Sequence, residues 1–286
     1  MISFFAMSMN SYSQCSDAGV CSLGSHKHQE EEEAGANSSV SLNGRIGYSG
    51  KDDDVTYNSI NASGNFGLSR NLSANFSIPF NMQSGPAGDF SGIGDLILGI
   101  TFSQPLDRES SLDIKVGGKF ATGDANQGTT PGNTSLPLIY QSGMGTNDIL
   151  FGVTYNYMDF MATLGGQVPL DRSKNDYSQL QRGTDLLLGL GYTFPASEQF
   201  FVTGEIITIK RLSKSNIILG GAEFDVPDSD FLQMNIQLGA NYLVSRNVGI
   251  NVSGAIPLMK RDTNVDGTKR AFTFSAGASY YFNLGL

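Results

Sequence analysis

The chain has 286 residues and a formal net charge of −9, with 16% charged residues, 40% hydrophobic residues and 35 glycines. A typical soluble domain carries roughly 25% charged residues, so this chain is poor in charge without being rich in apolar residues. No run of about 18 apolar residues occurs after the amino terminus, which excludes membrane-spanning helices. The acidic balance, with no basic stripe to neutralise phosphates, excludes nucleic acid as a partner.

The amino-terminal segment has features of an exported protein. Residues 1–14 (MISFFAMSMNSYSQ) combine a short apolar stretch with small polar residues, and we interpret them as a signal peptide that lacks its positively charged start. Residues 15–37 follow as a flexible, acidic periplasmic segment. Cys15 and Cys21 are close in sequence, which in an exported protein favours a local disulfide. Lipidation of Cys15, directly after the expected cleavage point, is the alternative.

The only two histidines, His26 and His28, precede a run of four glutamates in the same segment. Imidazole, thiolate and carboxylate groups are all metal ligands, so a metal site that includes the nearby cysteines is one interpretation. The other is a solvated tether, because the segment has low complexity and no surrounding hydrophobic pattern. We favour the tether and predict neither a metal nor another cofactor.

From Ser38 onward, apolar and polar residues alternate with the period of a β-strand. In residues 72–82, for example, six apolar side chains share one face and serine, asparagine and proline share the other. Twelve such strands are predicted, at residues 39–49, 57–69, 72–83, 93–104, 111–122, 147–157, 160–170, 184–195, 199–211, 231–244, 248–258 and 271–282.

The connections between these strands alternate in length. Those after every second strand are short, such as Arg70–Asn71 and Met158–Asp159, whereas the others are usually longer and more polar, up to Gly123–Thr146. Short turns at one end and long loops at the other are typical of bacterial outer-membrane barrels, and an even strand number puts both termini on the periplasmic side. We therefore predict an all-β, transmembrane antiparallel β-barrel of about 12 strands over residues 38–286.

Aromatic side chains on the apolar faces gather near the short turns, where an interfacial girdle belongs. They are Phe66, Phe102, Tyr155, Tyr157, Phe160, Tyr192, Phe194, Phe200, Tyr242, Tyr280 and Phe282. The chain has no tryptophan, so phenylalanine and tyrosine would form the girdle alone.

Two motifs recur along the predicted barrel. Pro79, Pro169 and Pro257 follow an isoleucine or valine and lie 90 and 88 residues apart. The segment 92–99 (GIGDLILG) has a counterpart in 183–189 (GTDLLLG). The repeating unit is four strands, so twelve strands make three units, and the third needs the first strand as its last member, which closes the barrel.

The GIGDLILG motif, within a barrel rich in glycine and asparagine, resembles outer-membrane proteins of the MetA pathway of phenol degradation, relatives of the FadL-like channels for hydrophobic compounds. The resemblance covers roughly residues 38–282. It implies a barrel that passes small, often apolar molecules across the outer membrane. The chain departs from that family at its amino terminus, where the short, acidic residues 15–37 argue against a FadL-like plug with an ordered ligand site.

The strand phase directs several charged side chains into the lumen, among many asparagines, serines, threonines and glutamines. These candidates are Arg45, Asp95, Asp113, Lys115, Lys119, Asp148, Asp185 and Glu205. They would either tune the passage of ions and polar solutes or form internal salt bridges that fill a narrow barrel. The acidic loops 52–54 and 225–230 would either hold calcium or be merely solvated.

The three prolines are candidate breaks in the barrel wall, because proline has no N–H to give to a strand ladder. In FadL-like channels such a break lets apolar compounds leave sideways into the membrane. Pro79, followed by the loop expected at residues 85–94, is the preferred position. The alternative is that all three prolines simply end their strands above the membrane.

These observations predict an outer-membrane channel or porin-like transporter for small compounds, hydrophobic ones included, with membrane lipids and a small-molecule solute as partners. The alternative is a non-transporting structural or plug subunit of a larger envelope complex. We do not expect an enzyme. No histidine follows residue 28, so Ser–His nucleophilic catalysis is unavailable within the barrel.

Overall fold

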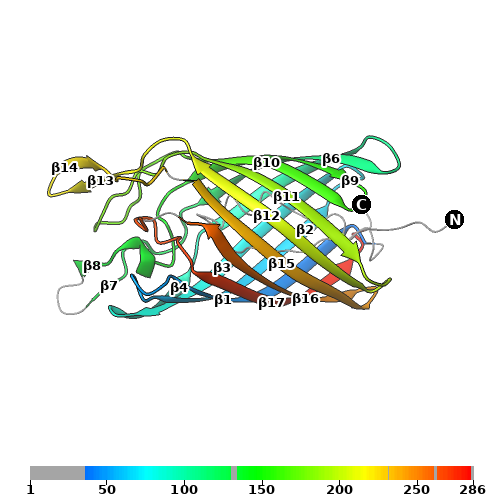
Figure 1. Cartoon of the computed structure of the whole chain (residues 1–286), viewed down its shortest axis with the longest axis horizontal. Coiled ribbons are helices and arrows are strands. Elements are labelled where there is room, and N and C mark those ends of the chain that lie inside the picture. Colours follow the sequence, from blue (N-terminus) through cyan, green and yellow to red (C-terminus); the bar gives the residue numbers. More distant parts are fainter. Residues whose placement is uncertain (1–35, 130–133, 231, 261–262, 285–286) are drawn as a thin grey trace.

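The alternating segments form the wall of one closed antiparallel β-barrel in the computed structural model (Figure 1). The structure describes residues 36–129, 134–230, 232–260 and 263–284. The twelve strands of the wall are β1 (Ser38–Tyr48), β2 (Thr56–Gly67), β3 (Leu72–Gly85), β5 (Leu96–Pro105), β6 (Ser110–Phe120), β9 (Asp148–Tyr157), β10 (Phe160–Pro169), β11 (Asp185–Pro195), β12 (Phe200–Arg211), β15 (Leu232–Ser245), β16 (Val248–Met259) and β17 (Phe272–Phe282). The predicted strand number and order are confirmed.

The barrel closes between its first and last strands. Ser38 at the start of β1 lies opposite Phe282 of β17 on one side and Phe66 of β2 on the other. Each wall strand therefore pairs with two neighbours, which removes the free edges that the membrane interior does not tolerate. Both ends of the described barrel chain lie at the end that carries the short turns, as predicted (Figure 1).

The connections separate by length between the two ends of the barrel. At one end the turns between strands have two to four residues, as at Met158–Asp159 and Leu68–Asn71. At the other end the connections are longer and contain small elements of their own: β7 (Gly128–Thr129), β8 (Thr134–Ser135), the 3-10 helix η1 (Leu138–Tyr140), β13 (Asn216–Leu219) and β14 (Ala222–Asp225). Short turns thus mark the periplasmic end and long loops the extracellular end.

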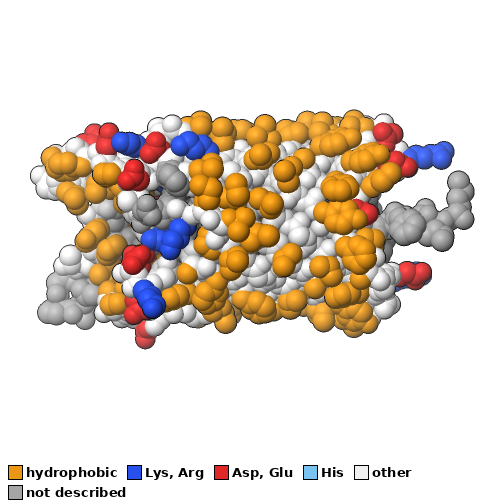
Figure 2. Space-filling view, in the orientation of Figure 1, with side chains coloured by type: hydrophobic (Ala, Val, Ile, Leu, Met, Phe, Trp, Pro, Cys, Tyr) orange, Lys and Arg blue, Asp and Glu red, His pale blue; other side chains and the backbone are white. Residues whose placement is uncertain are grey.

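The two faces of the wall differ as the sequence period requires. Apolar side chains point outward and form a broad band around the barrel, whereas charged side chains gather toward its two ends (Figure 2). Leu238, for example, is 61% exposed, whereas the inward Asn235 on the same strand is 0% exposed. A soluble protein rarely exposes so large an apolar surface, so this band is the surface that faces lipid.

The outward aromatic residues near the short turns contact one another across neighbouring strands. Phe160 and Tyr192 have ring centroids 4.6 Å apart, and Phe66 lies 6.4 Å from Phe282 across the seam between β1 and its neighbours. These pairs form the predicted interfacial girdle at the periplasmic end.

In the part of the chain that the structure describes, none of the helices has the length and apolar character that a membrane span requires.

One predicted boundary is wrong. The sequence suggested a flexible loop at residues 85–94 and a fourth strand that begins at residue 93. In the structure, β4 (Gly88–Ile93) extends the hairpin and pairs with the end of β3, and β5 begins only at Leu96. The glycines of this segment were interpreted as loop formers, but backbone pairing to β3 overrides that local preference.

A register shift of one residue separates β4 from β5 along β3. Phe80 lies opposite Ile93, whereas Ser77 lies opposite Ile97, so Gly94 and Asp95 form a bulge beside Pro79. Bulges commonly occur where a strand must redirect a side chain. Here the bulge directs the Asp95 carboxylate toward the lumen, where it is buried.

The three repeated prolines occupy different places in the wall. Pro169 is the last residue of β10, whereas Pro79 and Pro257 lie within their strands. Pro79 is part of an unbroken ladder with β2, and on its other side its carbonyl accepts a hydrogen bond from the Gly94 N–H at 2.7 Å. A lateral opening at Pro79 therefore requires β4 and β5 to separate from β3, and it stays a prediction.

Candidate functional site

The longest extracellular connection folds into the mouth of the barrel and is held there by side chains of the wall. The Asp95 carboxylate accepts hydrogen bonds from the backbone N–H groups of Gly123 at 3.0 Å and of Met144 at 2.8 Å. On β3, Asn81 donates to the Ser142 carbonyl at 2.7 Å and Gln83 to the Gln141 carbonyl at 2.9 Å. We call residues 121–129 and 134–147 the mouth loop.

A glycine pair lets the mouth loop approach the wall so closely. A Cβ atom on Gly143 would lie 2.6 Å from the Asp95 Oδ1 atom and 2.7 Å from the Cα atom of Gly123. Any larger residue would therefore displace the loop from the carboxylate. The Gly-rich composition of this stretch, which suggested only a long polar loop, reflects its close packing in the lumen.

A network of buried charges lies beneath the mouth loop on the β6–β10 side. The Nζ atom of Lys119 is 2.8 Å from the Oδ2 atom of Asp148 and 3.9 Å from the Oδ2 atom of Asp95. Arg182 donates to the same Asp148 oxygen at 2.8 Å, and Gln167 also hydrogen-bonds it. Buried ionic groups persist when partners of opposite charge satisfy them, as here.

A second part of the network connects the wall to the last extracellular loop. Arg211, at the end of β12, binds both Asp185 oxygens at 2.9 Å and the Asp266 carboxylate at 2.9 Å. The same guanidinium donates to the Ser215 hydroxyl at 3.0 Å. A bidentate arginine–carboxylate pair, as between Arg211 and Asp185, fixes the orientation of the guanidinium. Through its contact with Asp266, the same guanidinium anchors residues 263–271 over the lumen.

An apolar layer lies one or two inward positions from these charges, toward the periplasm. It consists of Ile97, Leu150, Leu187, Ile207 and Ile209, which are buried and contact one another inside the barrel. These side chains fill the part of the lumen next to β5, β9, β11 and β12. In contrast, the inward positions of β1, β2 and β17 carry mostly serine, asparagine and glycine, which leave more room.

The structure directs all eight charged candidates from the sequence toward the interior. It brings Asp95, Lys119, Asp148 and Asp185 into the buried network. Asp113, Lys115 and Glu205 are also buried but lie nearer the short turns. Arg45 is half-buried and lines a cavity in the mouth of the lumen.

Sequence reasoning missed four charged residues of this region. Arg211 shares the inward phase of Glu205 on β12, so the strand period alone would have found it. Arg182, Asp266 and Arg270 lie in loops, where no period indicates which way a side chain points.

The other predicted sites are not part of this region. Cys15, Cys21, His26 and His28 lie outside the described residues. In the part of the chain that the structure describes, no three histidine, cysteine, aspartate or glutamate side chains gather as a metal site. The acidic loop 52–54 instead makes polar contacts: Asp53 accepts from Asn264 at 2.6 Å, and Asp54 accepts from Tyr48 at 2.7 Å.

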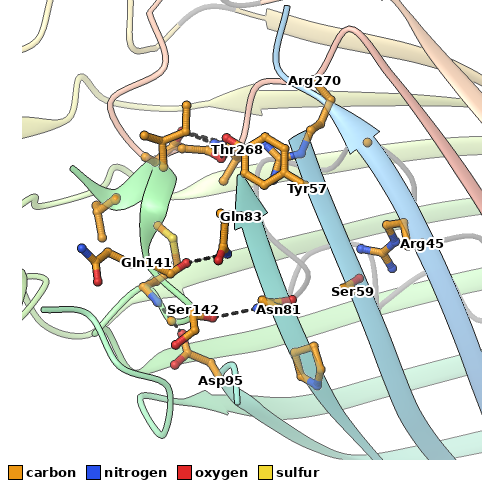
Figure 3. Close-up of a pocket in the computed structure, with 18 of the residues that line it drawn as sticks. Arg45, Tyr57, Ser59, Asn81, Gln83, Asp95, Gln141, Ser142, Thr268 and Arg270 are labelled. Atoms are coloured by element: carbon orange, nitrogen blue, oxygen red, sulfur yellow. Dashed lines mark hydrogen bonds between the residues drawn. The ribbon is translucent and has the colours of Figure 1, made fainter. Parts of the chain in front are cut away.

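A cavity of about 150 Å³ lies between the mouth loop and the wall formed by β1, β2 and β3 (Figure 3). We call it the mouth cavity. Its charged and polar lining includes Arg45, Ser59, Asn81, Gln83, Asp95, Lys119, Asp266, Thr268 and Arg270. Its apolar lining includes Tyr57, Pro79, Ile97, Leu138, Ile139 and Met144. The cavity is therefore amphipathic.

The guanidinium of Arg270, which lines the mouth cavity, is stacked on an aromatic ring. Its guanidinium lies over the Tyr57 ring, 3.2 Å from the ring centroid, and its Nη1 atom donates to the carbonyls of Gly267 and Lys269. Burial lowers the pKa of Arg270, against the opposing effects of Tyr57, Asp266 and Asp53. Arg270 nevertheless remains cationic at neutral pH, as arginine does in proteins.

A closed antiparallel barrel with an apolar outer band, an aromatic girdle and a polar, charged lumen defines a bacterial outer-membrane β-barrel. The chain is similar to the COG4313 outer membrane channel from Pseudomonas putida F1, with a TM-score of 0.67, 15% identity, and coverage of 86% of this chain and 96% of that one. It is also similar to the NanC porin, with a TM-score of 0.53, 9% identity, and coverage of 84% and 100%.

At these identities the likeness shows the shared fold. No protein-family model and no curated protein matches the sequence, so the resemblance to the MetA-pathway family stays a prediction. The outer-membrane location expected from the sequence is confirmed.

Proposed function

We propose that this chain is a passive outer-membrane channel for small solutes, which enter the lumen through the mouth cavity. One observation carries the proposal: a cavity of about 150 Å³ inside the extracellular end of a membrane barrel, with a mixed polar and apolar lining. An engineered cavity of ~150 Å³ accommodates a benzene-sized molecule, so the solutes are small. The names of the two similar structures, a channel and a porin, support the same role.

The mixed lining refines the solute class. Leu138, Ile139 and Met144 of the mouth loop present apolar surface to the cavity, together with Pro79 and Ile97 of the wall. A purely hydrophilic porin has no need of such a surface. The channel therefore accepts small molecules with an apolar part, in agreement with what the resemblance to FadL-like channels implies.

The test is reconstitution of the purified chain in planar bilayers and in liposomes that swell when solutes enter. We expect discrete single-channel currents and swelling with small solutes. Ser59→Trp, which fills the mouth cavity from β2, should reduce both. Leu106→Trp adds the same ring at an exposed periplasmic turn and should leave both unchanged.

An absence of current and swelling from correctly folded protein would contradict the proposal. Co-purification of defined envelope proteins in that case would favour the alternative, a structural or plug subunit. Equal effects of the two tryptophan variants would show that solutes do not use the mouth cavity.

A further inference from the structure

Three apolar side chains point into the lumen at its periplasmic end. Phe201, Leu243 and Tyr281 are buried and form one cluster inside the barrel. Phe201 lies at the start of β12, whereas Leu243 and Tyr281 lie near the ends of β15 and β17, so all three are next to the short turns. We call these three residues the exit cluster.

The exit cluster departs from the alternation of apolar and polar residues along the wall. At the same depth, the preceding residues Phe200, Tyr242 and Tyr280 face outward in the aromatic girdle. The wall is therefore apolar on both faces at this level, whereas the lumen of a membrane barrel is ordinarily polar. One inward position further from the turns, β15 and β17 return to the polar residues Asn241 and Ser279.

A glycine on β16 makes room for the Tyr281 ring in the exit cluster. A Cβ atom on Gly249 would lie 3.0 Å from the Tyr281 hydroxyl oxygen and 3.1 Å from its Cε2 atom. Gly249 lies opposite Leu243 on β15 and opposite Ser279 on β17. Because Gly249 has no side chain, the ring can lie over β16 and join the cluster. A larger residue at this position would displace the ring.

The chain segment that enters β1 also contacts the exit cluster. The Asn37 carbonyl accepts the Gly67 N–H at 2.9 Å, and the Asn37 side chain exchanges hydrogen bonds with the Leu284 backbone at 2.9 and 3.1 Å. These contacts hold Asn37 at the seam where the barrel closes. The preceding residue, Ala36, packs against the exit cluster. The cluster therefore extends from the wall to the start of the described chain.

The wall across the lumen carries small polar side chains. Around the twelve-stranded barrel, β12 is six strands from β3, and β15 is six strands from β5, so these strands face each other. Ser73 of β3 and Thr101 of β5 lie opposite one another next to the short turns, and both are buried. The way out of the lumen thus runs between an apolar side and a side of hydroxyl groups.

We propose that the exit cluster is the selective constriction through which solutes leave the lumen for the periplasm. Solutes with an apolar part pass in contact with Phe201, Leu243 and Tyr281, whereas hydrated ions and wholly polar solutes are slowed. Apolar side chains offer no hydrogen-bonding group to replace the water that an ion sheds, so ions cross an apolar constriction poorly. This assignment rests on the proposed channel and adds the residues that set its selectivity.

The discriminating substitution keeps the size of the side chain and removes its apolar character. Burial of apolar side chains stabilises a barrel whether or not solutes pass them, so a loss of stability alone does not identify a constriction. Leucine and asparagine side chains are similar in size. Leu243→Asn therefore changes the polarity of the exit cluster with little change in the width of the passage.

The experiment compares single-channel currents and liposome swelling for two pairs of variants. Leu243→Asn and Tyr281→Ser alter the exit cluster. Val244→Asn and Tyr280→Ser introduce the same new residues at the neighbouring outward positions, which are exposed. The swelling solutes are L-leucine and L-asparagine, two zwitterions of similar size, of which only the first has an apolar side chain. Folding of each variant is checked by the shift of the unheated band on gels.

We expect the ion current to rise several-fold in Leu243→Asn and Tyr281→Ser, and the preference for L-leucine over L-asparagine to fall in both. The two outward variants should match the wild type. Phe201→Ser serves as the second inward change if Tyr281→Ser misfolds. Wild-type current and preference in the inward variants, or equal changes in the outward ones, overturns the proposal. Equal entry of the two solutes in the wild type also overturns it.

The outcome is separable from that of the proposed function. A wild type that conducts, with inward variants that behave like it, keeps the channel and loses the exit cluster as its constriction. Silence of the wild type and of every inward variant in both assays contradicts the channel and the constriction together.

Discussion

Removal of the Asp95 carboxylate should open the mouth of the barrel. This side chain accepts hydrogen bonds from the N–H groups of Gly123 at 3.0 Å and of Met144 at 2.8 Å. A hydrogen bond to a charged group contributes about 1.5–3 kcal/mol, so the two together hold the mouth loop by about 3–6 kcal/mol. Asp95→Ala loses both. A difference of about 1.4 kcal/mol changes an equilibrium constant tenfold. The equilibrium fraction of molecules in which the mouth loop is released from the wall should therefore rise by about a hundredfold or more.

The assay is single-channel current in planar bilayers, together with proteolysis of the mouth loop in folded protein. We expect Asp95→Ala to conduct more and to be cut faster between residues 121 and 147. Asp107→Ala is the matched control, because that carboxylate accepts a backbone N–H from Glu109 at 2.8 Å in an exposed periplasmic turn. Wild-type current and cleavage in Asp95→Ala, or the same increase in Asp107→Ala, would refute the assignment of the loop's anchor.

Three further predictions address the membrane orientation and the buried charges. Leu238→Arg places a charge in the lipid-facing band and should destabilise the barrel by about 2–4 kcal/mol in bilayer unfolding experiments; an unchanged stability would show that this face is not in lipid. A cysteine at Gly128 should react with an impermeant reagent on intact cells and one at Asn247 should not, and the reverse result would invert the topology. Asp185→Asn should lower the unfolding temperature markedly, because it leaves Arg211 partly unpaired in the lumen, whereas the double replacement with Arg211→Gln should recover part of the loss; a deeper loss in the double variant would contradict this account.

The period of the strands was sufficient to predict most of the barrel wall. A membrane barrel has lipid on one side and a polar lumen on the other, so every second residue is constrained in opposite ways. This constraint let the sequence direct Lys119, Asp148 and Asp185 inward without any knowledge of their partners. The same constraint predicted the number of strands. Each alternating segment has to be long enough to span the membrane, so each such segment counts as one strand.

The alternation of apolar and polar residues does not predict side-chain directions where the chain leaves the barrel wall. Arg182, Asp266 and Arg270 lie in loops that fold back over the lumen, and their positions depend on contacts between segments far apart in sequence. The bulge at Gly94 and Asp95 was missed for a related reason. The glycines of residues 85–94 suggest a loop in the sequence. Only the pairing of β4 with β3 shows that this segment continues the hairpin.

The internal repeat carries information of a different kind from the period. The motif acids Asp95 and Asp185 each lie near a cation at the end of the following strand, Lys119 in the first unit and Arg211 in the second. The repeat therefore conserves an electrostatic arrangement along with the apolar residues of the wall. The third unit keeps its proline but not its acid, and the mouth cavity lies at that position with Arg270 over Gly47. A threonine and a glycine, Thr273 and Gly47, occupy the positions where the second unit has its ion pair, so the break in the repeat explains why this part of the lumen has room for the mouth cavity.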